Sequence, residues 1–158
     1  MFNVQTGYSL MASNLKIPDY LKKGQAMGYQ SLAIADINVL HGVYDFYQKA
    51  KAIGVTPLIG MRVQMPSWLE EDQLDDFLVY ARSQKGFQGL IALSKTLNHH
   101  SPSVNEIRSI IRKHKGHLIY ISLGQASSLD QFIIHDQKRL AQELLKLLEE
   151  DFSKENVY

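Results

Sequence analysis

Apolar and polar positions follow two periods along this chain, a period of two that predicts strands and a period near 3.6 that predicts helices. Residues 2–6 alternate in the first way and form an expected strand, with the amides of Asn3 and Gln5 on its polar side. Residues 29–36, YQSLAIAD, are a continuous run of small apolar residues, which is typical of a strand covered on both faces. Three more strands are expected, at 55–65, 75–82 and 116–124.

Helices are expected between these strands, at 13–28, 41–54, 83–98, 101–114 and 136–152. Gly28 is a natural helix terminator, and Ser103 with Glu106 forms a capping-box pattern. Because strands and helices alternate, the sequence predicts an α/β fold with a mainly parallel sheet, whose functional groups gather at the carboxyl ends of the strands. Val157 and Tyr158 look like the start of another strand, so we expect the chain to be part of a longer protein.

Composition and charge narrow the class of function. A chain of 158 residues fits a single domain, and its 17 basic residues balance 16 acidic ones, so bulk charge does not indicate a polyanionic partner. Cysteine is absent, which excludes disulfides, thiolate zinc sites and thiol nucleophiles and agrees with a reducing cytoplasm. The first residues lack the charged and apolar regions of a signal peptide, so we expect none, and no apolar run approaches the ~20 residues of a membrane span. We expect a soluble cytoplasmic protein that does not contact a membrane.

Three stretches of the chain carry a resemblance to a known family. Residues 3–10, NVQTGYSL, match a block that in the family opens with a His-x-His strand and continues to Tyr-Ser-Leu. Residues 28–63, GYQSLAIADINVLHGVYDFYQKAKAIGVTPLIGMRV, match a second block, and residues 78–94, LVYARSQKGFQGLIALS, match a third. Together they resemble the N-terminal PHP (polymerase and histidinol phosphatase) domain of bacterial DNA polymerase III alpha subunits. The resemblance implies that residues 1–158 form the first part of a distorted (β/α) barrel of the PHP type.

The resemblance assigns a cluster of divalent metals to five positions that carry other side chains here, namely Asn3, Gln5, Ala12, Ile37 and Arg62. An amide oxygen is a weak ligand for zinc, manganese or iron, and isoleucine has no donor atom. The guanidinium of Arg62 places a fixed positive charge where cations would lie. Only Asp36 keeps an acidic side chain. We therefore expect no metal, no cofactor and no catalytic residue in this chain.

Arg62 is a candidate to fill the vacated position. If it is buried, it needs a partner, and Asp36 ends the neighbouring strand, so we expect the two side chains to pair. The alternative is an arginine exposed on the sheet. Asp75, on the polar approach to the strand at 75–82, is expected to matter less for stability than Asp36.

Histidines and basic residues elsewhere are weaker candidates. His41 could be a relic metal ligand or a general base. We favour a surface residue at a helix start, because a lone imidazole is rarely a catalyst. His99 and His100 lie in a polar turn, where loop polarity explains them.

Two other segments are candidates for phosphate binding. GFQG at 86–89 lacks the lysine of a phosphate loop and indicates a helix start. A basic cluster either contacts phosphate or, the favoured interpretation, forms a solvated helix end. Its members are Arg108, Arg112, Lys113, His114, Lys115 and His117.

The resemblance implies a parent protein that is a DNA-directed DNA polymerase, a nucleotidyltransferase of DNA replication whose chemistry takes place in another domain. This chain would be its structural PHP module, with phosphoesterase or exonuclease activity lost. Its partners would be the remainder of the alpha chain, other replication factors, and DNA through other domains. Two alternatives remain open: a free-standing PHP-type phosphoesterase of the histidinol phosphatase kind, and a protein-binding domain unrelated to polymerases.

Overall fold

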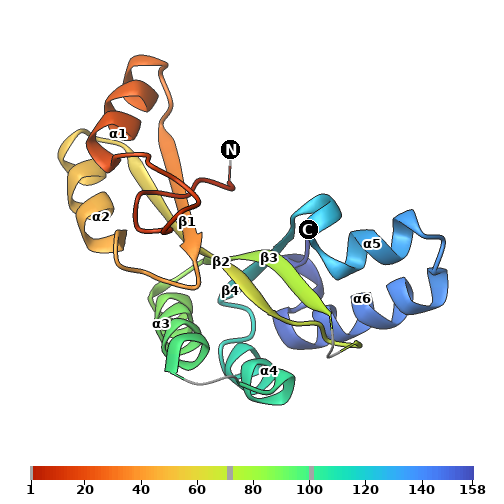
Figure 1. Ribbon diagram of the computed structural model, residues 1–158. Coiled ribbons are helices and arrows are strands. Elements are labelled where there is room, and N and C mark those ends of the chain that lie inside the picture. Colours follow the sequence, from red (N-terminus) through yellow and green to blue (C-terminus); the bar gives the residue numbers. More distant parts are fainter. Residues whose placement is uncertain (1, 71–72, 100–101) are drawn as a thin grey trace.

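The computed structural model describes residues 2–70, 73–99 and 102–158. Within these ranges four strands form one sheet, in the order β1 (Ser31–Ile37), β2 (Thr56–Pro66), β3 (Leu74–Ala81) and β4 (Leu118–Ser122). β1 and β2 run parallel, whereas β3 is antiparallel to both of its neighbours. The expectation of a mainly parallel sheet is therefore wrong: the fold is α/β with a mixed, open sheet (Figure 1).

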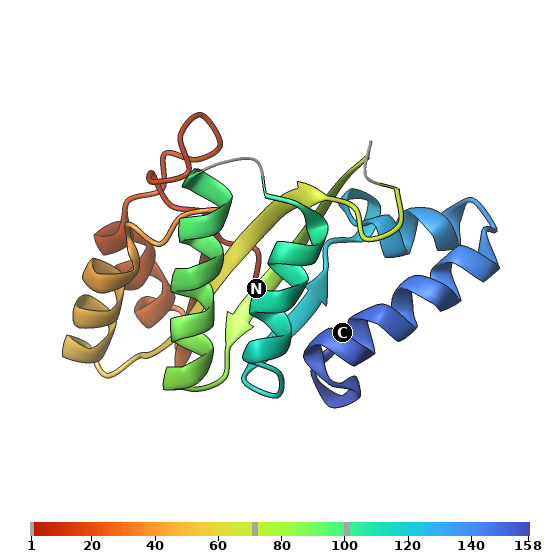
Figure 2. The ribbon, with the colours of Figure 1, turned by 90° about the horizontal axis from the view of Figure 1, so that it is seen from below.

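The connections between strands explain the mixed sheet. Only residues 67–73 separate β2 from β3, which is too short for the crossover that a parallel pair requires. Between β3 and β4 the chain forms two helices, α3 (Gln84–His99) and α4 (Val104–Lys113). These helices run in opposite directions (Figure 2), so the chain re-enters the sheet at the end where it left it. β4 is consequently antiparallel to β3.

The remaining helices are α1 (Ile17–Ala26), α2 (Val43–Ala52), α5 (Ser128–Ile134) and α6 (Lys138–Phe152), with 3-10 turns at Gly124–Ala126 and Lys154–Asn156. The five expected helices are confirmed, four with shorter bounds and α3 shifted by one residue, and α5 is an addition that the sequence pattern did not predict. The capping box of α4 is present, because Ser103 Oγ accepts from the Glu106 N–H and the Glu106 carboxylate accepts from the Ser103 N–H.

The two ends of the described chain lie along the outer strands. Residues 2–6 form no strand, but Val4 O accepts a hydrogen bond from Ala35 N at 2.7 Å, so this segment follows the edge of β1. At the other side of the sheet, Val157 makes an isolated parallel bridge to Tyr120 of β4. The strand expected at the start is thus wrong, and the strand-like character expected near Val157 is confirmed as a single bridge.

Helices cover one face of the sheet through two apolar clusters. The larger cluster joins β2, β3 and β4 to α3, α4, α5 and α6 and contains the fully buried rings of Phe77, Tyr120 and Phe152. The smaller one joins β1 to α1 and α2 through Ile34 and Phe46. Figures 1 and 2 show these helices along the sheet, with α1 and α2 beside β1 and α4 and α6 toward β4.

The opposite face of the sheet is covered differently. Its apolar cluster contains strand residues such as Leu78 and Tyr80, and no residue from the helices of the described ranges belongs to it. Phe2 of the N-terminal segment packs edge-on against Tyr80, with ring centroids 5.7 Å apart, and the Tyr80 hydroxyl donates to the Phe2 carbonyl oxygen. Burial raises the pKa of Tyr80, so this hydroxyl stays a donor.

Two glycines let α3 pack closely against the segment before β4. A Cβ atom on Gly86 would lie 2.0 Å from His117 O, and one on Gly89 would lie 2.9 Å from Cγ of His114. The GFQG sequence therefore has a packing explanation within the helix. As for membranes, none of the helices in the ranges described combines the length and apolar character needed to span one.

Candidate functional site

The carboxylate of Asp36 holds the N-terminal loop at the carboxyl end of β1, where its side chain is buried. Thr6 donates to it from its N–H at 2.6 Å and from its hydroxyl at 2.8 Å, and the Ser9 hydroxyl donates at 2.6 Å. The Ser9 oxygen in turn accepts from the Ile37 N–H at 3.1 Å. The TGYSL motif thus has a structural explanation, since Thr6 and Ser9 tie the loop to β1.

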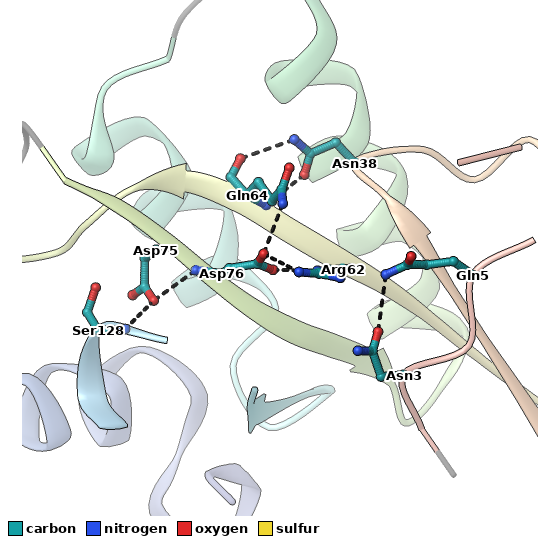
Figure 3. A network of polar contacts seen from close by, with 8 residues as sticks. All are labelled: Asn3, Gln5, Asn38, Arg62, Gln64, Asp75, Asp76 and Ser128. Atoms are coloured by element: carbon teal, nitrogen blue, oxygen red, sulfur yellow. Dashed lines mark hydrogen bonds and ion pairs between the residues drawn. The ribbon is translucent and has the colours of Figure 1, made fainter. Parts of the chain in front are cut away.

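Arg62 of β2 and Asp76 of β3 form a two-point ion pair (Figure 3). Arg62 Nε donates to Asp76 Oδ1 at 2.7 Å and Nη2 donates to Oδ2 at 2.5 Å, the fork geometry that arginine and a carboxylate favour. The two side chains are 21% and 13% exposed. The hydrogen bonds that Arg62 donates to Asp76 raise the pKa of Arg62 further above its already high value, so the positive charge here is permanent.

Gln64 and Asn38 extend this pair into a network (Figure 3). Gln64 Nε2 donates to Asp76 Oδ2 at 2.9 Å. The Asn38 side chain exchanges two hydrogen bonds with the Gln64 backbone, donating at 3.1 Å and accepting at 2.9 Å. Asn38 has φ 54°, a left-handed conformation that asparagine adopts more readily than most residues, and its carbonyl oxygen accepts from Ser94 Oγ of α3 at 2.8 Å. The network connects the end of β1 to β2, β3 and α3.

The expected pairing of Arg62 with Asp36 is wrong, and the sheet register gives the reason. Asp36 lies opposite Met61 and Ile37 lies opposite Arg62 in the parallel pair of β1 and β2. Successive side chains of a strand point to opposite faces, so Asp36 and Arg62 are on different faces of the sheet. Asp76 has the right parity to meet Arg62, because Arg62 pairs with Leu78 and Gln64 with Asp76 in the antiparallel register.

The side chains at the other expected ligand positions do not fit a divalent metal. Gln5 Nε2 donates to Asn3 Oδ1 at 3.3 Å, Ala12 is exposed in a turn, and Ile37 has no donor atom. The Asp36 oxygens are engaged by Thr6 and Ser9, as above. Over residues 2–70, 73–99 and 102–158, no three histidine or acidic side chains converge in a way that could hold a metal ion.

Asp75 is a buried acid that the sequence did not single out as structural. Its side chain is 0% exposed, and Oδ1 accepts from the N–H groups of Ser128 at 2.8 Å and of Asp76 at 3.0 Å. Oδ2 has no hydrogen-bond partner among the described residues, and neither has the buried hydroxyl of Tyr120. Burial raises the pKa of Asp75, and the two backbone donors offset this only in part. The expectation that Asp75 lies in a polar segment before the strand is therefore wrong. Because Asp75 is buried, its replacement is not a suitable control for the replacement of Asp36.

The histidine candidates lie apart from the network. His41 is exposed, and its ring lies edge-on to Tyr8 with centroids 6.4 Å apart, as expected of a surface residue near a helix start. His99 is exposed near the end of α3, and His100 lies outside the described residues.

His114 of the basic cluster is buried at the end of α4, with Nδ1 2.9 Å from Ile110 O. His117 Nδ1 lies 2.9 Å from Ser83 Oγ, and Lys113 and Lys115 are exposed.

The two arginines of the basic cluster form ion pairs with one buried carboxylate, Asp151 of α6. Arg108 Nε lies 2.7 Å from Asp151 Oδ2, and Arg112 Nε lies 2.5 Å from Oδ1. Trp68 Nε1 donates to Oδ2 at 3.0 Å. These contacts connect α4 to α6. Arg108 is 15% exposed, so it is not part of a solvated helix end, whereas Arg112 is 49% exposed. A phosphate contact of the cluster stays a prediction.

Comparison with known proteins gives the family context of this geometry. The model of the PHP domain family matches residues 2–158. DNA polymerase III subunit alpha of Buchnera aphidicola subsp. Acyrthosiphon pisum is 31% identical over 143 residues, which cover 87% of this chain and 12% of the relative. The same subunit of Halalkalibacterium halodurans is 37% identical over 92 residues, or 58% of this chain and 8% of the relative.

A third relative extends the match over nearly the whole chain. DNA polymerase III subunit alpha of Buchnera aphidicola subsp. Schizaphis graminum is 28% identical over 155 residues, covering 96% of this chain and 13% of the relative. The chain thus spans 8 to 13% of the length of these three curated relatives. Among solved structures, a protein described provisionally as a metal-dependent phosphoesterase from Bifidobacterium adolescentis aligns with 90% of this chain and 50% of its own, at 12% identity and a TM-score of 0.45.

Proposed function

The chain belongs to the PHP domain family, and from this premise we propose that it is the N-terminal PHP module of a DNA polymerase III alpha subunit and serves there as a structural element without hydrolytic activity. The similarity to alpha subunits supports the first part, since the match covers 87% and 96% of the chain in two of them. In this proposal residues 1–158 are a portion of a longer polymerase chain in the cytoplasm.

The loss of phosphoesterase or exonuclease activity rests on one observation, the ion pair of Arg62 with Asp76 at an expected metal-ligand position. A divalent cation beside Arg62 would be repelled by a permanent positive charge, and Asp76 is already engaged by three donated hydrogen bonds. The neutral amides of Asn3 and Gln5 supply no negative charge to offset this. The network in Figure 3 thus supports a module that replaces metal coordination by a protein ion pair.

The proposed parent extends DNA by nucleotidyl transfer in another domain, and this module supports that domain. Its partners are then the remainder of the alpha chain, DNA through other parts of the parent, and other replication factors. The alternative, a free-standing metal-dependent phosphoesterase of the histidinol phosphatase kind, requires ligands that the chain lacks at five positions, and no contact described above favours it.

A hydrolysis assay tests the proposal. The purified chain is incubated with bis(p-nitrophenyl) phosphate, p-nitrophenyl phosphate and a 3′-labelled single-stranded oligonucleotide, each with manganese, zinc or iron(II) added. We expect no release of nitrophenol or of nucleotides above the level of the heat-denatured chain. Metal-dependent turnover of any of the three substrates, abolished by a chelator, would contradict the loss of activity and favour the phosphoesterase alternative.

A further inference from the structure

An apolar groove runs between α2 and α3, on the helix-covered side of the sheet that Figure 2 shows. It has a volume of about 650 Å³. Its floor is formed by the start of β2 and the end of β3, and α2 contributes Tyr44 and Tyr47 while α3 contributes Phe87 and Ile91. Most of the lining belongs to the helix-covered side, and neither Arg62 nor Asp76 lines the groove, so it is a separate site.

The groove follows the boundary between the two apolar clusters of the core. Leu40, Ile59 and Phe87 pack against both clusters and are only partly buried, and all three line the groove. The rim is more exposed still: Tyr44 is 76% exposed and Ile91 is 48% exposed. Exposed aromatic and aliphatic side chains that are concentrated along one concave strip mark an interaction surface more often than scattered ones do.

The charge around the groove has one sign. Among the described residues that line the groove, Arg82 is the charged one and none carries a carboxylate. Lys51 lies over the Tyr47 ring at 5.9 Å from its centroid, and Lys95 is exposed one helical turn beyond Ile91 on α3. The acid of α2, Asp45, is paired with Lys49 at 2.7 Å. A ligand for this groove therefore needs apolar groups for the strip and negative charge for its rim.

We propose that this groove binds an amphipathic, acidic helix of a protein partner. Apolar side chains at i, i+3 or i+4, and i+7 lie between α2 and α3, and the acidic residues of the helix face Arg82, Lys51 and Lys95. This is the helix-in-groove mode of recognition, in which apolar anchors provide affinity and charges provide orientation and specificity. The site does not depend on the absence of a metal, so it stands or falls separately from the function proposed above.

A peptide selection tests this proposal. A phage-displayed library of random 16-residue peptides is selected on the immobilised chain, and enriched peptides are synthesised with a fluorescent label. Binding is measured by anisotropy for the parent and for Ile91→Glu and Arg82→Glu. The matched controls are Ile133→Glu, also an exposed isoleucine on a helix (60% exposed), and Arg139→Glu, an exposed arginine of α6. Circular dichroism and thermal unfolding establish that each variant folds.

We expect enriched peptides to carry net negative charge and helical spacing of apolar residues. Their Kd should rise by about tenfold or more in Ile91→Glu and Arg82→Glu, and stay within about twofold in the controls. The proposal is overturned if no peptide is enriched, if the enriched peptides are basic or lack the spacing, or if Ile91→Glu leaves binding unchanged. It is also overturned if sedimentation shows a dimer that Ile91→Glu dissociates, because the groove would then belong to a second copy of the chain.

Discussion

At the scale of single residues, three aspartates of the sheet, Asp36, Asp75 and Asp76, have three different environments. Asp36 accepts three hydrogen bonds from the N-terminal loop, Asp76 forms an ion pair on the open face of the sheet, and Asp75 is buried with only backbone donors. Asp75 and Asp76 are adjacent in sequence and point to opposite faces. The environment of each carboxylate therefore determines what its removal should do.

Replacing Asp36 should loosen the N-terminal loop. In Asp36→Ala the N–H and hydroxyl of Thr6 and the hydroxyl of Ser9 lose their acceptor in a buried place, and we expect a loss of about 3 kcal/mol in the free energy of unfolding. Urea denaturation measures this, with Asp45→Ala as the control, because Asp45 is an exposed partner of Lys49 whose loss should cost well under about 1 kcal/mol. Equal losses for the two variants would show that Asp36 does not hold the loop.

The stability of the chain should depend on pH through Asp75. Its pKa is raised by burial, so above its ordinary value of 3.8 the folded state holds the proton more tightly than the unfolded chain does. The stability that comes from the protonated carboxyl is therefore lost as the pH rises toward and through the raised pKa. Asp75→Asn removes this loss and keeps an acceptor at Oδ1. The free energy of unfolding of the variant should therefore increase relative to that of the parent as the pH rises.

Urea unfolding of the parent and of Asp75→Asn at pH 4 and pH 8 measures this difference. The free energy of unfolding of the parent, relative to that of Asp75→Asn, should be lower at pH 8 than at pH 4. A difference between the two proteins that stays constant over this range would mean that the folded state does not raise the pKa of Asp75.

At the scale of elements, α4 and α6 are joined by charge as well as by apolar packing. Asp151 of α6 is 0% exposed and contacts Arg108 and Arg112 of α4 together with Trp68. Removing its charge leaves two cations without their partner, one of them only 15% exposed. We expect Asp151→Asn to lower the free energy of unfolding by about 3–5 kcal/mol.

Thermal or urea unfolding of Asp151→Asn checks this, and the neighbouring Glu150→Gln is its control. Glu150 is 64% exposed and lies 3.8 Å from Arg112, so its replacement should change stability by less than about 1 kcal/mol. If Asp151→Asn proved as mild as Glu150→Gln, the two helices would be held by apolar contacts alone.

The sequence predicts most elements, because their apolar periods are strong. The five expected helices and the strands β1 to β4 lie where the pattern indicates, and the Ser103–Glu106 capping box is present. The direction of the strands is harder to predict from the sequence, because it depends on the end of the sheet at which each connection re-enters it. The pair of helices between β3 and β4 returns the chain to the end of the sheet where β3 ends. The apolar periodicity predicts the two helices but not the direction in which they run.

The site could be predicted in part. That Arg62 would be paired could be inferred from its charge and its strand position, but its partner depends on register, which decides that Asp76 and not Asp36 shares its face. The alternation in LDDFLVYA was the available signal, because it places Asp76 with Leu78 and Tyr80. Residues 2–6 follow an alternating pattern without forming a strand, since only Val4 pairs with β1 through the backbone.

At the scale of the whole molecule, helices cover one face of the sheet, whereas on the other face Phe2 of the N-terminal segment packs against Tyr80. The second face carries the Arg62–Asp76 network together with apolar residues such as Leu58, Ile119 and Ile121, which are partly buried. The chain spans only 8 to 13% of the length of the relatives named above. In the function proposed above, the Arg62–Asp76 ion pair occupies the position of a lost metal site on this face.

The metal content of the purified chain tests this central claim most directly. The chain is dialysed against zinc, manganese or iron(II) and then against buffer, and the retained metal is measured by elemental analysis, with a PHP protein that has the full histidine set as the positive control. We predict retention far below one equivalent of each metal, because Arg62 repels cations and Asn3, Gln5 and Ile37 supply no strong ligand. One or more equivalents retained at this site, and lost on addition of a chelator, would contradict the account.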